Sequence, residues 1–245
     1  MKTLRKVSLL LTLVALWAGL AVAVSAATTI FDNSVYDLGV RFNPGTTEVG
    51  DEISLGGTER YLTSFSFEFW GVNSASPGNV SFAGPVEARV RFYQNDGKPF
   101  NGYGTPNSVF YDSGWFSVPN PTPRATFGFF AGTDFPSGGL FIPPSATPWI
   151  SDLTWSVQFR NMGATDSVGV DLYSPAVVGL DYPDYWANNG GWTLQNGAVP
   201  MDFAARMEAN ADIPEPPVAA LSLLGVLGIV RVCLKKRPDG IGAGL

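Results

Sequence analysis

The sequence predicts an all-β protein whose main body is a single antiparallel β-sandwich, jelly-roll-like in type, and three observations support this. Apolar and polar residues alternate with period 2 in one segment after another, as they do in strands with one buried and one solvated face. The 28 glycines and 19 prolines are scattered and mark turns between these segments. No segment between residues 28 and 211 has convincing helical periodicity, so we expect helices only at the two ends of the chain.

Five segments show the alternation most clearly. The residues predicted to be buried are Phe65, Phe67 and Phe69; Val86, Ala88, Val90 and Phe92; Leu153, Trp155, Val157 and Phe159; Val168, Val170 and Leu172; and Phe203, Ala205 and Met207. The residues between them, among them Glu68, Thr154 and Ser156, are expected to face solvent. About nine to eleven such strands fit between the turns, which favours a jelly-roll-like double sheet over an immunoglobulin-like one. No linker or repeat divides residues 27–211, so we expect one domain there.

The composition excludes several kinds of site. The chain contains no histidine, and its single cysteine, Cys233, lies close to the C-terminus. Ser-His and Cys-His nucleophile pairs, histidine zinc sites and disulfide bonds within the main body are therefore excluded. Between Thr28 and Ala211, eight basic residues stand against 18 acidic ones, a net charge of −10. A domain of this charge repels nucleic acid, so we expect no nucleic-acid partner, no metal and no cofactor.

Residues 1–26 are predicted to be a signal peptide. A basic head precedes an apolar run from residue 7 to residue 24, and small residues follow it. This is the layout that signal peptidase recognises. We expect cleavage after Ala26, with Ala23 and Ala27 as neighbouring alternatives, and an uncleaved membrane anchor as the competing interpretation. The main body is therefore expected to be exported.

The C-terminal segment 212–237 combines three features in a fixed order. The triplet Pro214, Glu215 and Pro216 precedes an almost wholly apolar stretch, residues 217–230. A basic cluster follows, which consists of Arg231, Lys235, Lys236 and Arg237. By the positive-inside rule this cluster stays in the cytoplasm and the main body lies outside, tethered by a membrane helix. The alternative is a buried helix of the domain. Residues 238–245 form a short tail.

This order of features resembles the PEP-CTERM sorting signal of bacterial exosortase systems. The resemblance implies that Pro214, Glu215 and Pro216 are recognised by an exosortase-type membrane protease, which processes the protein for display at the cell surface or in the extracellular matrix. Two features depart from the family pattern: Arg231 interrupts the apolar run, and "PDGIGAGL" follows the basic cluster. Stretches of the body such as "LTSFSFEFWG" and "FYDSGWFSV" also resemble a type of PEP-CTERM ectodomain. That likeness implies the fold and location and supplies no activity.

The densest candidate site in the body is the loop from Leu180 to Trp192. Its aromatic residues are Tyr182, Tyr185, Trp186 and Trp192. Together with nearby carboxylates they fit a sugar-binding platform, because aromatic faces stack on pyranose rings. The ligand would then be an exopolysaccharide. The alternative is a long loop that is pinned by its own aromatic side chains.

The sequence also offers candidates for a calcium site and for a pair of catalytic carboxylates. Asn95 and Asp96 fit a calcium loop, but Asn-Asp-Gly is also the sequence of a tight hairpin turn, and no Asp-x-Asp-x-Asp series is present. A pair of carboxylates can hydrolyse a glycosidic bond without histidine. The glutamates on or beside strands are Glu52, Glu59, Glu68, Glu87 and Glu208, and the sequence places no two of them together.

The sequence therefore predicts a secreted, surface-sorted structural or adhesive protein without catalysis. The alternative is a carbohydrate-binding module that uses the aromatic loop 180–192, and the third possibility is a histidine-free glycoside hydrolase.

Overall fold

The computed structural model describes residues 26–145 and 153–211, and these belong to one compact unit. They contain fifteen strands and a single 3-10 turn, Pro77–Asn79, with no α-helix in these two ranges. The described part of the protein is thus all-β, as predicted, with more strands than the nine to eleven expected. The difference comes in part from two-residue strands, which are too short to show an alternating pattern. The predicted sorting signal, its basic cluster, the tail and all of the signal peptide except Ala26 lie outside the described residues.

One antiparallel sheet is built around the long strand β4. Its strands are β1 (Thr28–Asn33), β2 (Asp37–Phe42), β4 (Tyr61–Asn73), β8 (Thr122–Phe130), β9 (Leu140–Phe141), β11 (Asp166–Tyr173) and β15 (Ala205–Asn210). β15 and β11 follow one another along one edge of β4, while β9 and β8 pair with its other edge. β1 extends the sheet beyond β15, and β2 extends it beyond β11.

The other antiparallel sheet is built around β3 and β10. Its strands are β3 (Glu48–Ser54), β5 (Glu87–Tyr93), β6 (Val109–Asp112), β7 (Phe116–Ser117), β10 (Leu153–Arg160), β12 (Leu180–Asp181), β13 (Asp184–Asn188) and β14 (Trp192–Asn196). β12 and the β13–β14 hairpin pair with one edge of this sheet, at β3. β6 and β7 pair with β5 and form its other edge.

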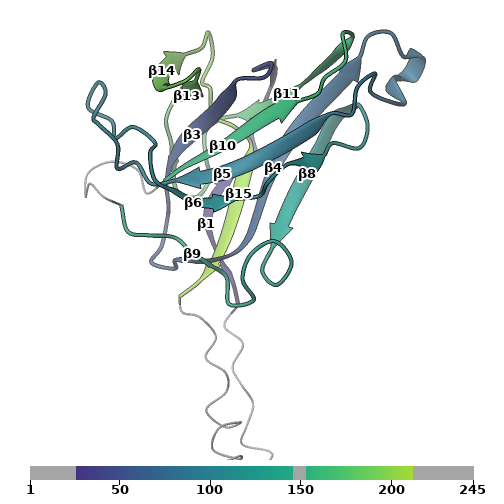
Figure 1. Ribbon diagram of the computed structural model, residues 1–245. Helices are drawn as coiled ribbons and strands as arrows, with labels where there is room; N and C mark the ends of the chain where they lie inside the picture. Colours follow the sequence, from purple (N-terminus) through teal and green to yellow (C-terminus); the bar gives the residue numbers. More distant parts are fainter. Residues whose placement is uncertain (1–25, 146–152, 212–245) are drawn as a thin grey trace, which may run out of the picture. The chain divides into compact units, whose positions relative to one another are not determined.

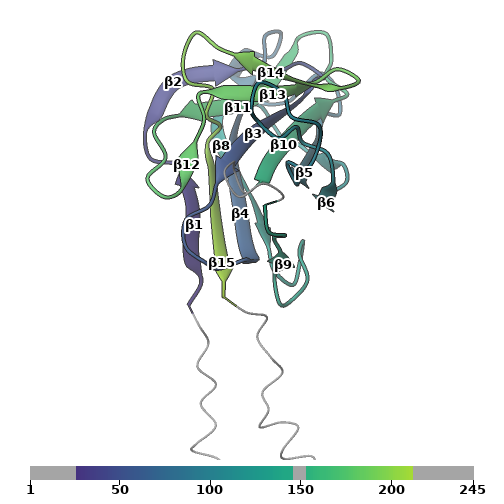
Figure 2. The same ribbon diagram turned by 90° about the vertical axis from the view of Figure 1, so that its left-hand side faces the viewer.

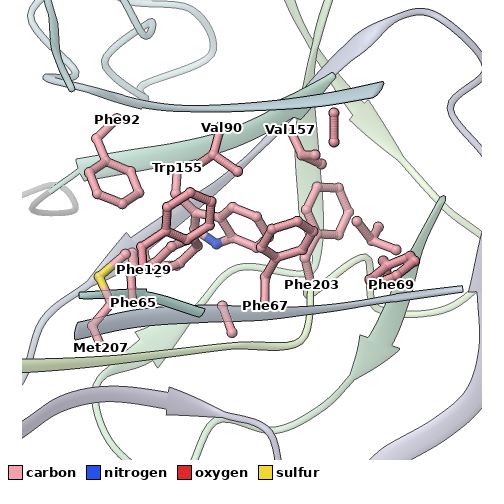
Figure 3. Packing of buried hydrophobic residues seen from close by; sticks show 14 of the residues in the cluster. Phe65, Phe67, Phe69, Val90, Phe92, Phe129, Trp155, Val157, Phe203 and Met207 are labelled. Carbon is pink, nitrogen blue, oxygen red and sulfur yellow. The ribbon is translucent and has the colours of Figure 1, made fainter. Parts of the chain in front are cut away.

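The hydrophobic core lies between the inner faces of the two sheets. Phe65 of β4 contacts Trp155 of β10 at a ring-centroid distance of 5.3 Å and Phe92 of β5 at 5.0 Å. Figure 3 shows Phe65 and Phe67 pointing from their strand toward Trp155. Every residue that the alternation predicted to be buried is buried, so the predicted inner faces are confirmed.

The prediction that the alternate residues face solvent is wrong for Tyr93, Asp202 and Ala204, which are buried, and for Thr154, Ser156 and Glu68. Thr154 and Ser156 are 0% exposed and Glu68 is 8% exposed. Each is covered by side chains from distant segments: Thr154 donates to Asn95, Ser156 donates to Glu48, and Glu68 accepts from the hydroxyl of Tyr173. Period 2 separates the two faces of a strand correctly, but it does not show that a second layer covers the outer face.

The chain enters and leaves the body at the same end. Thr28, the first residue of β1, pairs with Ala209 near the end of β15. Both strands run to the same end of the body in Figures 1 and 2. Among the residues that the structure describes, no helix has the length and apolar character needed to cross a membrane.

Candidate functional site

The aromatic residues of the predicted platform do not form one exposed surface. Trp186 on β13 is completely buried, and its indole nitrogen donates to Glu52 Oε2 at 2.8 Å. Tyr185, the preceding residue, projects from the other face of β13 and packs edge-on against Phe42 at 5.0 Å. Because neighbouring strand residues point in opposite directions, these two rings are not available to the same ligand.

Tyr182 and Trp192 are partly buried and contact other aromatic rings. Trp192 packs edge-on against Tyr93 at 5.2 Å, and Tyr182 packs edge-on against Tyr103 at 5.9 Å. The Tyr182 hydroxyl also lies 3.4 Å from the hydroxyl of Ser54. These contacts hold residues 180–192 along the edge of β3, with which β12 and β13 pair, an arrangement that fits a segment pinned by its own aromatic side chains.

Beneath this segment, Glu48 of β3 is the centre of a buried hydrogen-bond network. Its carboxylate accepts from the Tyr93 hydroxyl at 2.7 Å, from the Ser156 hydroxyl at 2.7 Å and from Arg91 at 2.8 Å. Asn188 donates a fourth hydrogen bond at 3.2 Å. Burial raises the pKa of Tyr93 to about 12, so its hydroxyl stays protonated and keeps donating. With its acceptor positions filled, Glu48 stabilises the fold and has no lone pair left for a ligand.

The five glutamates considered for glycoside hydrolysis each bind a neighbouring donor group, and no two of them lie together. Glu52 lies four residues from Glu48 on the same strand, about 13 Å away along β3 at the usual rise per residue. The remaining partners are Arg124 for Glu68, Arg160 for Glu87, Arg206 for Glu208 and the backbone N–H of Thr58 for Glu59. None of these pairings brings two glutamates together as an acid and a base.

Asn95 and Asp96 lie in the long connection between β5 and β6, residues 94–108, whose tight turn is formed by Phe100 to Tyr103, so the tight hairpin turn expected at Asn-Asp-Gly is wrong. Asp96 accepts from the backbone N–H of Ser108 at 2.9 Å and from its hydroxyl at 2.6 Å, which ties the two arms of this connection together. Asn95 is buried and accepts from Thr154 at 2.7 Å. In the ranges 26–145 and 153–211, no group of three or more His, Cys, Asp or Glu side chains is arranged to hold a metal ion.

Three aspartates form a cluster inside the protein that sequence analysis missed. This core acid cluster consists of Asp51 on β3, Asp181 on β12 and Asp202 just before β15. Burial raises the pKa of Asp51 and of Asp181 well above the usual range, with a further contribution from neighbouring carboxylates. Burial also raises the pKa of Asp202 to about 6. No described Arg or Lys forms an ion pair with any of the three, and the cluster therefore favours protonated, uncharged carboxyl groups.

One signal in the sequence marks the cluster. Asp51 stands two residues from Val49 and two from Ile53, so period 2 puts it on the apolar face of β3. Asn33, which is also buried, donates from Nδ2 to Asp181 Oδ2 at 2.8 Å. An acid on an inner face indicates either a buried polar network or a functional group.

Two clefts open where the edges of the two sheets meet. The edge cleft has a volume of about 390 Å³ and lies between β6–β7 of one sheet and β8 of the other. Its lining consists of Tyr111, Asp112, Ser113, Phe116, Phe127, Gly128, Phe129, Thr133 and Asp134. A second cleft, also of about 390 Å³, lies on the other side of β7 and includes Phe82, Glu87, Ser117 and Asn161. The aromatic-rich stretches "FYDSGWFSV" and "TFGFFAGTDF" are the sequence signal for the edge cleft, which sequence analysis did not identify as a site.

Comparison of the chain with protein-family models, curated proteins and solved structures finds no match in any of the three. The function must therefore be inferred from the residues of the chain itself. Of the features above, the edge cleft combines several aromatic rings with polar groups that remain open to solvent.

Proposed function

We propose that the protein is exported and sorted to a bacterial cell surface or extracellular matrix, where its β-sandwich-like body, jelly-roll-like in arrangement, has a structural or adhesive role without catalysis. The support comes from the ends of the chain. A signal-peptide pattern opens it, and Pro214-Glu215-Pro216, an apolar stretch and a basic cluster follow the body in the order of a PEP-CTERM signal. Signal peptidase and an exosortase-type protease are the expected processing partners.

The structural observation that carries this proposal is the pairing of Thr28 with Ala209. β1 begins and β15 ends at the same end of the body, so the segments that precede and follow the body both join it there. This arrangement suits display of a domain from a membrane or matrix. If the last strand ended at the opposite end of the body, the two chain termini would leave the body at different ends.

The placement of carboxylates supports a role without catalysis. Glycoside hydrolysis needs one carboxyl group that holds a proton and a second one across the scissile bond. Asp112, which lies at the edge cleft, is paired with Arg89, and the hydrogen bond with Arg89 lowers the pKa of this aspartate. It is therefore a poor general acid. The aspartates of the core acid cluster, whose pKa values are raised by burial, are enclosed by the fold.

Carbohydrate binding is the second candidate function. The buried position of Trp186 weakens the loop 180–192 as a platform, whereas the edge cleft offers aromatic rings together with free polar groups. Binding of this kind fits an adhesive role in a polysaccharide matrix.

Sorting is tested by cell fractionation in a host that carries an exosortase, with an epitope tag placed between Ala211 and Asp212. We expect Glu215→Ala to accumulate as the unprocessed form in the membrane, while Pro217→Ala, one residue beyond the triplet, is processed normally. If Glu215→Ala matures and reaches the surface as the parent does, the segment is an anchor rather than a sorting signal, and the proposal fails.

A further inference from the structure

We infer that the edge cleft binds a pyranose unit of a neutral polysaccharide. This inference rests on the proposed adhesive function and names its ligand and its site. A volume of about 390 Å³ falls within the usual range for small-ligand pockets, which are mostly apolar with a few polar groups that fix orientation. The lining of the edge cleft is more polar than this, with four aromatic rings and the polar side chains of Asp112, Ser113, Thr133 and Asp134, a mixture suited to a ligand that carries many hydroxyl groups.

The apolar side of the cleft consists of rings that the core holds in place. Phe116 packs edge-on against Phe127 at 5.0 Å and against Phe129 at 5.6 Å. Phe127 stacks on Phe69 of the core at 4.5 Å. Phe116 and Phe127 remain partly exposed. Rings fixed in this way present apolar surface to the C–H groups of a sugar with little further loss of side-chain entropy.

The polar side carries hydrogen-bonding groups with spare capacity. Thr133 and Asp134 are exposed, and Asp134 uses Oδ2 to accept from the backbone N–H of Phe130 at 2.9 Å. Within the described ranges, no hydrogen bond is made by Asp134 Oδ1, Thr133 Oγ1 or the Tyr111 hydroxyl. Burial, followed by the charges of Asp134 and Asp112, raises the pKa of Tyr111 to about 12. The cleft therefore offers a carboxylate that accepts and two hydroxyl groups that donate or accept, which matches the vicinal hydroxyls of a sugar.

The charge around the cleft favours a neutral ligand. Asp112 is bound by Arg89 through both carboxylate oxygens, and Arg91 lies 3.4 Å from it. Asp112 is therefore neutralised and attracts an organic cation only weakly. Asp134 and the net charge of −10 between Thr28 and Ala211 repel uronic acids and other anionic sugars.

The loop that carries Thr133 and Asp134 is ordered by its own backbone. Gly132 donates to Phe135 at 2.9 Å, Asp134 donates to Phe130 at 2.9 Å, and Ala131 donates to Thr63 of β4 at 2.9 Å. A preformed loop reduces the ordering cost of binding, so modest contacts with each sugar unit are sufficient for measurable affinity.

Isothermal titration calorimetry of the purified full-length chain tests the inference, with cellohexaose, mannohexaose and xylohexaose as neutral probes, hexagalacturonate as the anionic probe and choline as the cationic probe. We expect at least one neutral hexaose to bind, and hexagalacturonate and choline to bind at least tenfold more weakly. Thr133→Val and Asp134→Asn should each weaken binding of the neutral hexaose about tenfold, the effect of one lost hydrogen bond. Tyr111→Phe should do the same while preserving the ring.

Two matched variants serve as controls. Thr126→Val removes an exposed hydroxyl from β8 away from the cleft, and Asp96→Asn changes an exposed loop aspartate that, like Asp134, accepts from a backbone N–H. Both should bind as the parent does. The inference is overturned if no neutral hexaose binds, if hexagalacturonate or choline binds best, or if the three cleft variants bind as the controls do. Sorting is measured separately, so a protein that is displayed but binds none of these probes removes this inference alone.

Discussion

Asp51 accepts the backbone N–H of Phe203 with Oδ2 at 2.7 Å, inside the core acid cluster. The two residues are 152 positions apart in the chain, and Asp51 and Phe203 are both 0% exposed. The hydrogen bond links strand β3 of one sheet to the segment that leads into β15 of the other. A carboxyl group in this position costs little if it is protonated and a great deal if it is ionised, so the fold depends on the protonation of the core acid cluster.

We predict that the protein becomes less stable as pH rises from about 5 to about 8. Burial raises the pKa of Asp202 to about 6, and it raises the pKa values of Asp51 and Asp181 well above the usual range. The folded state therefore holds protons that the unfolded state has released, and this stabilisation is lost as pH passes through the folded pKa values. Roughly 1–3 kcal/mol should be lost over this range. Urea unfolding at closely spaced pH values measures it.

A neutral isostere provides the control for the pH effect. Asp51→Asn keeps an oxygen that accepts from Phe203 but no longer ionises, so its stability should vary less with pH than that of the parent. Stability that increases from pH 5 to pH 8 in the parent would show that the carboxyl groups are ionised in the folded protein.

The core aromatic residues should dominate stability. Phe67→Ala or Trp155→Ala removes a side chain that is 0% exposed and should cost about 3–5 kcal/mol of unfolding free energy, because it leaves a cavity between the sheets. Phe130→Ala is the matched control, since Phe130 is 55% exposed, and it should cost less than about 1 kcal/mol. The measurement is urea titration followed by tryptophan fluorescence, or by circular dichroism for the tryptophan variant. Similar losses for Phe67→Ala and Phe130→Ala would contradict the assignment of the inner face.

The buried Glu48–Arg91 pair should matter more than the exposed pair of Arg206 and Glu208. Glu48→Ala leaves Arg91 and the hydroxyls of Tyr93 and Ser156 without their acceptor, and should cost about 3–5 kcal/mol. Glu208→Ala breaks a pair at the surface and should cost less than about 1 kcal/mol. Thermal unfolding of the two variants under identical conditions compares them. Equal effects would mean that the Glu48 network is solvated.

The inner faces of the sheets were predictable because the alternation of apolar and polar residues along the sequence indicates which side of a strand is buried. Phe65, Phe67 and Trp155 were identified in this way. The outer layer was not predictable, because it depends on contacts between distant segments: Trp186 reaches Glu52 across 134 positions, and Asn188 reaches Glu48 across 140. The edge cleft could not be predicted from the sequence for a related reason. Tyr111 and Phe129 belong to different sheets, and only the packing of the two sheets brings their strands together.

The strand β15 closes the described body of the protein. β15 ends at Asn210, and its residues pair with β1 on one side and with β4 on the other. A chain truncated after Ala211 keeps all of these pairings, whereas a chain truncated after Ala204 loses β15 and leaves β1 without a neighbour in its sheet.

We therefore expect the chain truncated after Ala211 to give a β-type far-UV circular dichroism spectrum and a cooperative thermal transition. The chain truncated after Ala204 should give neither, because losing β15 exposes the inner face of β4 and removes Met207, which is 0% exposed, from the core. Fractionation of the longer product should find it outside the membrane, since it lacks the apolar stretch after Pro216. A chain truncated after Ala211 that does not fold would show that residues 212–245 are part of the folded domain, which is the alternative interpretation of the C-terminal segment.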